Sequence, residues 1–325
     1  MSGARPRVLI TRRWPEAAER RMMDRFDVTL NEGDHPLDEA ALIDAMRTFD
    51  AVCPTVSDRV GAAVIEAAGR RAAILGNFGV GYDHIDIAAC REFGVAVTNT
   101  PGVLTDATAD LTLTLMLMAA RRGGEGERLV RAGGWTGWGP TQLLGRSLAG
   151  RTLGLVGFGR IARAVAQRAH HGFGMRILYF ARREVDGDDV AALGAEWVPD
   201  LHTLLGRSDI VSLHVPGGVE TRHLINAAAF EAMKSEALLI NTARGDVLDH
   251  AALVGALKAG RIAGAGLDVY PHEPDVPAGL VELENVVLLP HLGSATVDTR
   301  VAMGLKVLDN LDAWFAGKGP PDRVV

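Results

Sequence analysis

The chain consists of short apolar runs separated by segments long enough to form helices, and this alternation constrains the fold most strongly. The runs occupy residues 7–11, 26–30, 50–54, 72–76 and 95–99, then 152–157, 176–181, 209–215, 237–242, 262–269 and 285–290. Strands that are apolar on both faces and alternate with helices are typical of parallel sheets covered on both sides. With 325 residues, the chain is long enough for two such domains. We therefore predict an α/β fold with two doubly wound parallel-sheet domains.

The division between the two domains is predicted from turn residues and from the last helical stretch. The segment "NTPG", residues 99–102, interrupts the apolar pattern, so the first boundary is placed after Thr100. A helix over residues 104–122 would then cross between the domains. Residues 297–317 have a helical pattern and no strand after them, which indicates packing back onto the first domain. The prediction is a discontinuous domain of residues 1–100 and 292–325, and a second domain of residues 101–291.

Composition narrows the classes of function. The net charge of −6 argues against a general nucleic-acid binder. The longest apolar run, residues 111–120, is about half the roughly 20 residues that a membrane span needs, so we expect a buried helix and no membrane partner. The N-terminal residues show no secretory pattern, and the two cysteines form no spaced motif. These features predict a cytoplasmic protein without a metal site.

A glycine-rich turn lies between the run at 152–157 and the helical pattern that follows it. Gly157, Gly159 and Ala162 form the pattern G-x-G-x-x-A. The first glycine permits a tight turn, and the second lets a pyrophosphate approach the backbone at the helix N-terminus. The small third residue allows the helix to pack closely on the strand. The context predicts a dinucleotide site, and the alternative is a glycine turn that binds no ligand.

The end of the next strand bears on which dinucleotide is bound. An acidic residue about 20 positions after the first glycine holds the ribose of NAD. Here the run 176–181 ends without an acid, and Arg182 and Arg183 follow. Arginine provides positive charge and fork-shaped donors for a 2′-phosphate. We therefore predict NADP(H) as the preferred cofactor. The alternative is that both arginines are solvated loop charges and that NAD(H) is used.

Polar residues at three further strand ends point to the chemistry. Arg244 follows the run 237–242, Asp268 and Glu273 follow the next, and His291 follows the last. Ligands of open α/β sheets bind at the carboxyl ends of the strands, so these residues should converge. A histidine can donate a proton to a keto oxygen, and a nearby carboxylate favours its charged form. An arginine can bind a carboxylate and polarise the carbonyl. We predict His291 as acid/base, Glu273 as its partner and Arg244 as the substrate-binding residue in the reduction of a 2-keto acid.

Five further histidines lack such companions for proton transfer. They are predicted to be structural or exposed: His84, His170, His171, His214 and His272.

Taken together, these motifs resemble a known family. The segments are "NFGVGYDHIDI", "NTPGVLTDATADL", "GLVGFGRIA", "NTARGDVLD", "LDVYPHEP" and "LLPHLGSAT", and they extend over nearly the whole chain. The chain resembles the D-isomer-specific 2-hydroxyacid dehydrogenases. The resemblance implies a Rossmann-type nucleotide domain and a flavodoxin-like substrate domain, with a cleft between them.

The resemblance also implies roles for individual residues. Substrate would be bound by Val80 and Gly81 through their backbone amides, and by Arg244 and His291. Asp268 would lie near the nicotinamide carboxamide and Thr108 near the nicotinamide end. The implied cofactor-binding residues are Thr108, Gly157, Phe158, Gly159, Arg160, Ile161, Ala181, Arg182, Arg183, His214, Val215, Pro216, Thr221, Thr242, Ala243, Asp268, His291 and Gly293.

Within the family, two segments look most like NADPH-dependent glyoxylate/hydroxypyruvate reductases. These are "GGWTGWGPTQLLGRSLAG", residues 133–150, and "YFARRE", residues 179–184. Trp135 and Trp138 could close the substrate pocket, cross a dimer interface, or hold the loop to its own core. One departure is Gly217-Gly218-Val219, where many relatives have a Leu-Thr-Pro-like segment on the adenosine side.

The leading hypothesis is an NADPH-dependent reductase of small 2-keto acids such as glyoxylate and hydroxypyruvate. The resemblance implies a homodimer with its interface on the second domain. A second hypothesis keeps the fold and changes the substrate to phosphoglycerate, formate or phosphite, with NAD. A third is a non-catalytic, nucleotide-sensing corepressor that binds protein partners.

Overall fold

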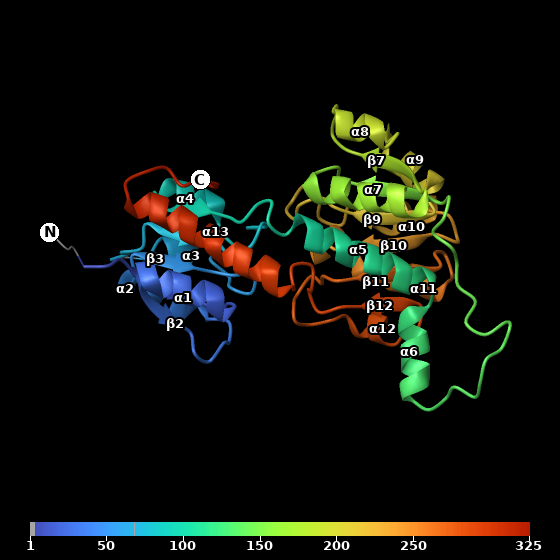
Figure 1. Ribbon diagram of the computed structural model, residues 1–325, viewed down its shortest axis with the longest axis horizontal. Coiled ribbons are helices and arrows are strands. Elements are labelled where there is room, and N and C mark those ends of the chain that lie inside the picture. The colour runs from blue at the N-terminus through green and yellow to red at the C-terminus, as the bar shows by residue number, and fades with distance from the viewer. Residues whose placement is uncertain (1–3, 68) are drawn as a thin grey trace. The chain divides into compact units, whose positions relative to one another are not determined.

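The structure is a computed structural model that describes residues 4–67 and 69–325 (Figure 1). The chain forms two compact units. Unit 1 contains the residues up to Leu104 together with Ser294–Val325, and unit 2 contains Thr105–Gly293. The chain therefore passes from one unit to the other after Leu104 and after Gly293. The sequence had placed these crossings after Thr100 and after His291.

Unit 1 is built on a five-stranded parallel sheet with the order β2-β1-β3-β4-β5. This is the flavodoxin-like order. The strands are β1 (Arg7–Ile10), β2 (Asp27–Leu30), β3 (Ala51–Cys53), β4 (Ile74–Gly76) and β5 (Ala96–Thr98). The register places Leu9 of β1 beside Val52 of β3. β3, β4 and β5 are buried throughout, as expected for strands covered on both faces.

Helices cover both faces of this sheet. One apolar cluster joins the sheet to α1 (Glu16–Arg25) and α13 (Val297–Phe315). The other joins it to α2 (Glu39–Thr48), α3 (Ala62–Ile65) and α4 (Ile87–Glu92). α13 packs against α1, so the last helix belongs to the first unit, as its sequence pattern indicated. Cys53 and Cys90 are buried in these clusters as free thiols.

Unit 2 is built on a seven-stranded parallel sheet with the order β12-β11-β10-β9-β6-β7-β8. Counted from β6, this is the Rossmann order with one further strand at the β12 edge. The strands are β6 (Thr152–Val156), β7 (Arg176–Phe180), β8 (Glu196–Trp197), β9 (Ile210–Leu213), β10 (Leu238–Asn241), β11 (Gly264–Leu267) and β12 (Val286–Leu288). The sequence did not predict β8, because two paired residues give no periodic signal.

The helices of unit 2 lie on both faces of its sheet. The helices are α5 (Thr105–Ala120), α6 (Gly123–Arg131), α7 (Arg160–Phe173), α8 (Asp188–Ala192), α9 (Leu201–Arg207), α10 (Ala227–Ala232), a 3₁₀ turn η1 (Gly245–Val247), α11 (His250–Lys258) and α12 (Ala278–Val281). α5 packs on α7, β10 and β11 and buries Leu113, Leu115 and Met116. The apolar run at 111–120 is thus a buried helix. None of the described helices is long and apolar enough to cross a bilayer.

Several helices begin where a short polar side chain accepts a hydrogen bond from the third residue after it. Asp38 accepts from Ala41, Asp86 from Ala89, Asp200 from Thr203, Asn226 from Ala229 and Asp249 from Ala252. Each bond satisfies an amide that the helix leaves unpaired, which stabilises its start by about 1 kcal/mol. These caps fix where the loops at the strand ends give way to helices.

Candidate active site and family membership

The glycine turn after β6 has the geometry that the fingerprint predicts. Gly157 has φ +92°, and a Cβ atom on it would lie 2.7 Å from the backbone oxygen of His214. Only glycine fits there without moving the neighbouring loop. Gly159 is the N-cap of α7, and a Cβ atom on it would meet no atom within 4 Å. Ala162 is fully buried against the sheet. The open side of the turn leaves space for a phosphate at the helix N-terminus.

The end of β7 presents the two predicted arginines to solvent. The side chains of Arg182 and Glu220 are 91% and 85% exposed and form an ion pair at 3.6 Å. The backbone oxygen of Ala181 accepts a hydrogen bond from Trp197 Nε1 at 3.2 Å, which fixes the residue before the arginines. Arg183 is also exposed. The sequence did not predict that Glu220 lies beside Arg182.

The loop after β9 approaches the glycine turn. His214 donates its backbone N–H to Val156 at 2.7 Å, and its Nε2 is hydrogen-bonded to Ser212 Oγ at 2.9 Å. Burial of the imidazole lowers the pKa of His214 to about 3, so the ring is neutral near pH 7. Thr221 Oγ1 donates to the backbone oxygen of Pro216 at 2.6 Å and closes the loop. His214 is therefore a neutral residue fixed beside the glycine turn.

Gly217 lies beside Arg244. A Cβ atom on Gly217 would lie 3.1 Å from Cγ of Arg244 and 3.2 Å from Oδ1 of Asp246. A larger residue there would press on the predicted substrate-binding arginine. The resemblance placed this segment on the adenosine side, whereas the structure shows that Gly217 also adjoins Arg244.

Arg244 itself is fixed by the buried end of β10. Asn241 Nδ2 donates to the backbone oxygen of Arg244 at 2.8 Å, and Asn241 Oδ1 accepts from the N–H of Ala243 at 3.0 Å. Arg244 Nη1 donates to the oxygen of Ala243 at 2.8 Å. Thr242 Oγ1 is hydrogen-bonded to Thr112 Oγ1 of α5 at 2.9 Å. Asn241 and Thr112 were not among the predicted site residues, although a polar residue that ends an apolar strand is a usable signal.

Glu273 and His291 form the pair that the sequence predicted. Nδ1 of His291 lies 2.7 Å from Oε2 of Glu273, and Oε1 of Glu273 accepts the N–H of Tyr270 at 3.0 Å. Burial would raise the pKa of Glu273, but the hydrogen bond and charge of His291 hold this pKa below its usual value. The two side chains are 32% and 31% exposed. The bond to Glu273 uses Nδ1, and Nε2 of His291 has no hydrogen-bond partner among the described residues, so Nε2 is available to a substrate.

Asp268 holds the backbone that carries His291. Its carboxylate accepts the N–H of Leu292 at 2.7 Å and of Gly293 at 2.8 Å, and its backbone oxygen accepts the N–H of His291 at 2.9 Å. Burial raises the pKa of Asp268, although these amides oppose the shift. Thr108 Oγ1 donates to the oxygen of Gly293 at 3.1 Å. Asp268 and Thr108 therefore meet at Gly293, and His291 is fixed with φ +53°.

The other two predicted substrate-binding residues belong to unit 1. Val80 and Gly81 follow β4, and their backbone N–H groups donate to no acceptor among the described residues. In unit 2, Glu273 is bonded to His291 and lies within electrostatic reach of Arg244, and the backbone of Asp268 is bonded to that of His291. Unit 1 separately presents a turn with two available amides.

Comparison with known proteins decides the family. Residues 113–293 match the family described as D-isomer specific 2-hydroxyacid dehydrogenase, NAD binding domain. A glyoxylate reductase from Thermococcus onnurineus is 46% identical over 327 residues, covering 98% of this chain and 96% of that protein. The chain belongs to the D-isomer specific 2-hydroxyacid dehydrogenase family. It is therefore an NAD(P)-dependent oxidoreductase.

Other members of the family show the same relationship. A glycerate dehydrogenase from Hyphomicrobium methylovorum is 38% identical over 314 residues, covering 97% of each chain. The solved NADPH-dependent glyoxylate/hydroxypyruvate reductase from Sinorhizobium meliloti, in complex with NADP and malonate, is 37% identical with a TM-score of 0.88. That match covers 99% of this chain and 97% of the solved one.

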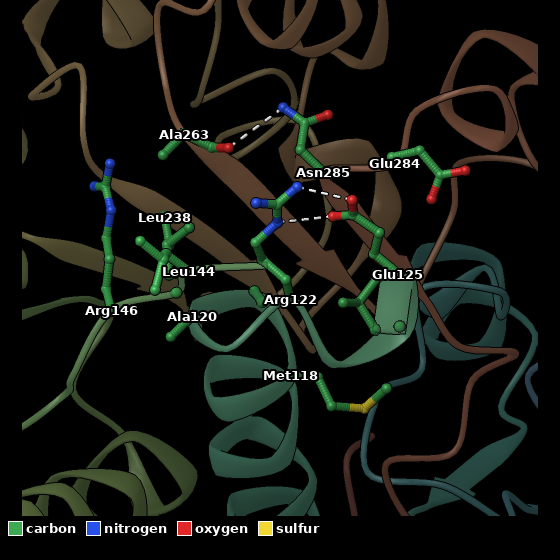
Figure 2. A pocket seen from close by; sticks show the side chains of 14 residues that line it. Met118, Ala120, Arg122, Glu125, Leu144, Arg146, Leu238, Ala263, Glu284 and Asn285 are labelled. Carbon is green, nitrogen blue, oxygen red and sulfur yellow. Dashed lines mark hydrogen bonds and ion pairs between the residues drawn. The ribbon is translucent and has the colours of Figure 1, made fainter. Parts of the chain in front are cut away.

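A hollow of about 400 Å³ lies where β10 begins at Leu238, beside Val287 of β12 (Figure 2). It is lined by residues near the end of α5, by α6 and by the β12 edge of the sheet, among them Met118, Leu144, Leu238 and Val287. Arg122 and Glu125 form an ion pair on its wall, as Figure 2 shows. None of the predicted site residues lines this hollow.

Proposed function

We propose that this dehydrogenase reduces a small 2-keto acid, such as glyoxylate or hydroxypyruvate, to the D-2-hydroxy acid with NADPH. The observation that carries the proposal is the His291–Glu273 pair at 2.7 Å beside a loop that fixes Arg244. The glyoxylate reductases among its relatives support this substrate class.

The side chains divide the chemistry between them. A bound reduced nicotinamide supplies the hydride that reaches C2 of the keto acid. His291 donates a proton from Nε2 to the carbonyl oxygen, because Nδ1 is occupied by Glu273. The carboxylate of Glu273 holds the ring through Nδ1 and so keeps Nε2 in position for this step. Arg244 stabilises the charge that develops on the oxygen, and the Val80 and Gly81 amides receive the substrate carboxylate.

The residues present fit a dinucleotide. Gly157 and Gly159 keep the phosphate side of the turn open, and no acidic residue lies in the first turn of α7. Phe158, Arg160 and Ile161 continue this turn, while Val215, Pro216 and Thr221 form the facing loop. Thr108, Thr242, Ala243, Asp268 and Gly293 would surround the nicotinamide end. We propose that Arg182 and Arg183 bind a 2′-phosphate, since both are exposed and carry fork-shaped donors.

NAD(H) is the second candidate cofactor, and Glu220 is the observation that favours it. Its carboxylate lies 3.6 Å from Arg182 and offsets part of the positive charge that a 2′-phosphate would need. In that case the same residues would carry out the same reduction.

We also propose a homodimer whose interface lies on unit 2. α6 buries none of its residues, and Figure 1 shows α6 and the segment after it extending away from the sheet. Val130, Trp135 and Leu144 are exposed, and Trp138 is 84% exposed. The alternative that the tryptophans hold the loop to its own core is not supported by this exposure. A second copy would cover this apolar face.

The test is a comparison of initial rates with glyoxylate and hydroxypyruvate, using NADPH and NADH at equal low concentrations. Turnover with a strong preference for NADPH is the expected result. Equal rates with both cofactors would assign the arginines to the surface and leave the reductase assignment intact. No turnover of either acid would overturn the assigned substrate class, and 3-phosphoglycerate and phosphite would then be tested with NAD.

A further inference from the structure

The turn after β4 is held by side chains to which neither the sequence nor the family comparison assigns a role. It is anchored by its backbone first. Asn77 donates its N–H to Thr98 at 3.1 Å, and Phe78 donates its N–H to Pro54 at 2.9 Å. These bonds join the start of the turn to the ends of the two neighbouring strands, β3 and β5. They leave open how the peptide groups of residues 79–81 are oriented.

Side-chain amides bind the carbonyl groups of these residues. Asn77 Nδ2 donates to the oxygen of Gly79 at 3.0 Å and to the oxygen of Gly81 at 2.9 Å. Asn99 Nδ2 donates to the oxygen of Val80 at 2.8 Å. The N–H of Thr100 also donates to the oxygen of Gly79, at 3.0 Å. All three carbonyl groups of the turn are therefore occupied.

Binding a carbonyl fixes the amide that follows it. In a planar trans peptide, the C=O of one residue and the N–H of the next point in opposite directions. Holding the oxygen of Gly79 therefore sets the direction of the Val80 N–H, and holding the oxygen of Val80 sets that of the Gly81 N–H. These are the two N–H groups that have no acceptor among the described residues. The side chains of Asn77 and Asn99 thus orient both donors.

His84 fixes the orientation of the Asn77 amide. Nε2 of His84 lies 2.9 Å from Oδ1 of Asn77. A side-chain amide nitrogen has two hydrogens, and both are used on the Gly79 and Gly81 oxygens. Only Oδ1 remains to meet the imidazole, so Nε2 must carry a hydrogen and donate it. Asn77 is fully buried, so turning its amide over would leave buried donors and acceptors without partners, which is costly.

We propose that Asn77, Asn99 and His84 are positioning residues that direct the Val80 and Gly81 amides at the substrate carboxylate. The inference rests on the proposed function, because it assumes a carboxylate at this turn. The three residues act through the backbone of residues 79–81, and they touch neither substrate nor cofactor. We name this group the carbonyl clamp.

The first test is Asn99→Ala, because Asn99 is only partly buried and its loss removes the side-chain amide that donates to the Val80 oxygen. KM for glyoxylate and the inhibition constant of oxamate, a keto-acid analogue with a carboxylate, should each rise about tenfold, the range for one hydrogen bond to a charged group. KM for NADPH should change by less than about twofold. The matched control is Asn31→Ala in the same unit, whose amide likewise donates to backbone carbonyls, those of Thr11 and His35. This control should leave all three constants unchanged.

A second pair of variants tests His84 without touching the turn. In His84→Gln, the amide nitrogen lies as many bonds from Cβ as Nε2 does, so it can still donate to Asn77 and should retain the wild-type KM. His84→Leu should raise KM and the oxamate constant as Asn99→Ala does. If the role of His84 were merely structural, the folded His84→Gln and His84→Leu variants would have equal inhibition constants for oxamate.

The outcomes separate the two proposals. If the wild type reduces glyoxylate and Asn99→Ala and His84→Leu bind oxamate as tightly as wild type, the carbonyl clamp is overturned and the proposed function stands. If the wild type reduces no small 2-keto acid and binds no oxamate, the proposed function fails and the carbonyl clamp fails with it.

Discussion

The two ends of the proposed cofactor site in unit 2 are built in opposite ways. At the catalytic end, Glu273 bonds to His291 and to a backbone amide, and Asp268 holds the backbone around the histidine. At the phosphate end, Arg182 has one long contact with Glu220, and both side chains are almost fully exposed. Chemistry needs reacting groups in fixed positions, whereas a phosphate can be bound by long charged side chains that order around it. Substitutions at the first end should therefore cost rate, and those at the second should change cofactor affinity.

The largest effect is expected from removing the proton donor. His291→Asn should lower kcat for glyoxylate reduction by roughly 10²–10⁴, the usual contribution of a general acid. Asparagine is chosen because it tolerates the positive φ of this position. The measurement is steady-state kinetics together with NADPH binding by fluorescence, and binding should be unchanged. A fall in kcat of less than tenfold would assign the proton to another group.

Next in size is the effect of Arg244→Lys. A lysine keeps the charge and loses the planar pair of donors, so kcat/KM should fall by about 10²–10³. Arg207→Lys is the matched control, because Arg207 forms an exposed ion pair with Glu196 on the same unit. The control should keep wild-type kinetics. Equal effects of the two substitutions would mean that Arg244 has no special part in the reaction.

Glu273→Gln should have a smaller effect than either of these. The amide keeps the size of the side chain but removes the carboxylate that lies 2.7 Å from Nδ1 of His291. kcat for glyoxylate should fall by about tenfold, the range for one hydrogen bond to a charged group. The measurement is steady-state kinetics with glyoxylate. An unchanged kcat would show that Glu273 only supports the local packing.

At the phosphate end, Arg182→Ala should raise KM for NADPH by about tenfold and leave KM for NADH unchanged. Glu220→Gln provides the opposite test, because it removes the carboxylate 3.6 Å from Arg182 and should lower KM for NADPH. Neither variant should alter kcat by more than about twofold, in contrast to those at the catalytic end. If both leave the NADPH and NADH constants as they are, the arginine is a surface charge.

The smallest effect concerns stability. A carboxyl group whose pKa is lowered in the folded state stabilises the fold above its unfolded pKa and loses this contribution as pH falls through the folded value. The pKa of Glu273 is lowered. The Tm of Glu273→Gln should therefore be below that of wild type at pH 7, and the difference should shrink as pH falls below about 4.3. A difference that is constant with pH would contradict the ionic contribution.

The sequence predicted the local chemistry better than the contacts between loops. Alternating apolar runs gave the parallel strands, and the positions of Gly157, Glu273 and His291 at strand ends were enough to suggest their roles. Glu220 beside Arg182 and Gly217 beside Arg244 could not be predicted, because those neighbours lie on different loops whose paths depend on tertiary packing. Asn77 follows one apolar run and Asn99 ends another, but only the structure shows which carbonyls they bind.

The three successive amides held by Asp268 have a mechanical consequence. The N–H groups of His291, Leu292 and Gly293 are all bonded to this one residue, and the chain leaves unit 2 directly after Gly293. A pull on the chain beyond that point would load the bonds to Leu292 and Gly293 first. Asp268 therefore holds the backbone between the imidazole of His291 and the point where the chain leaves unit 2.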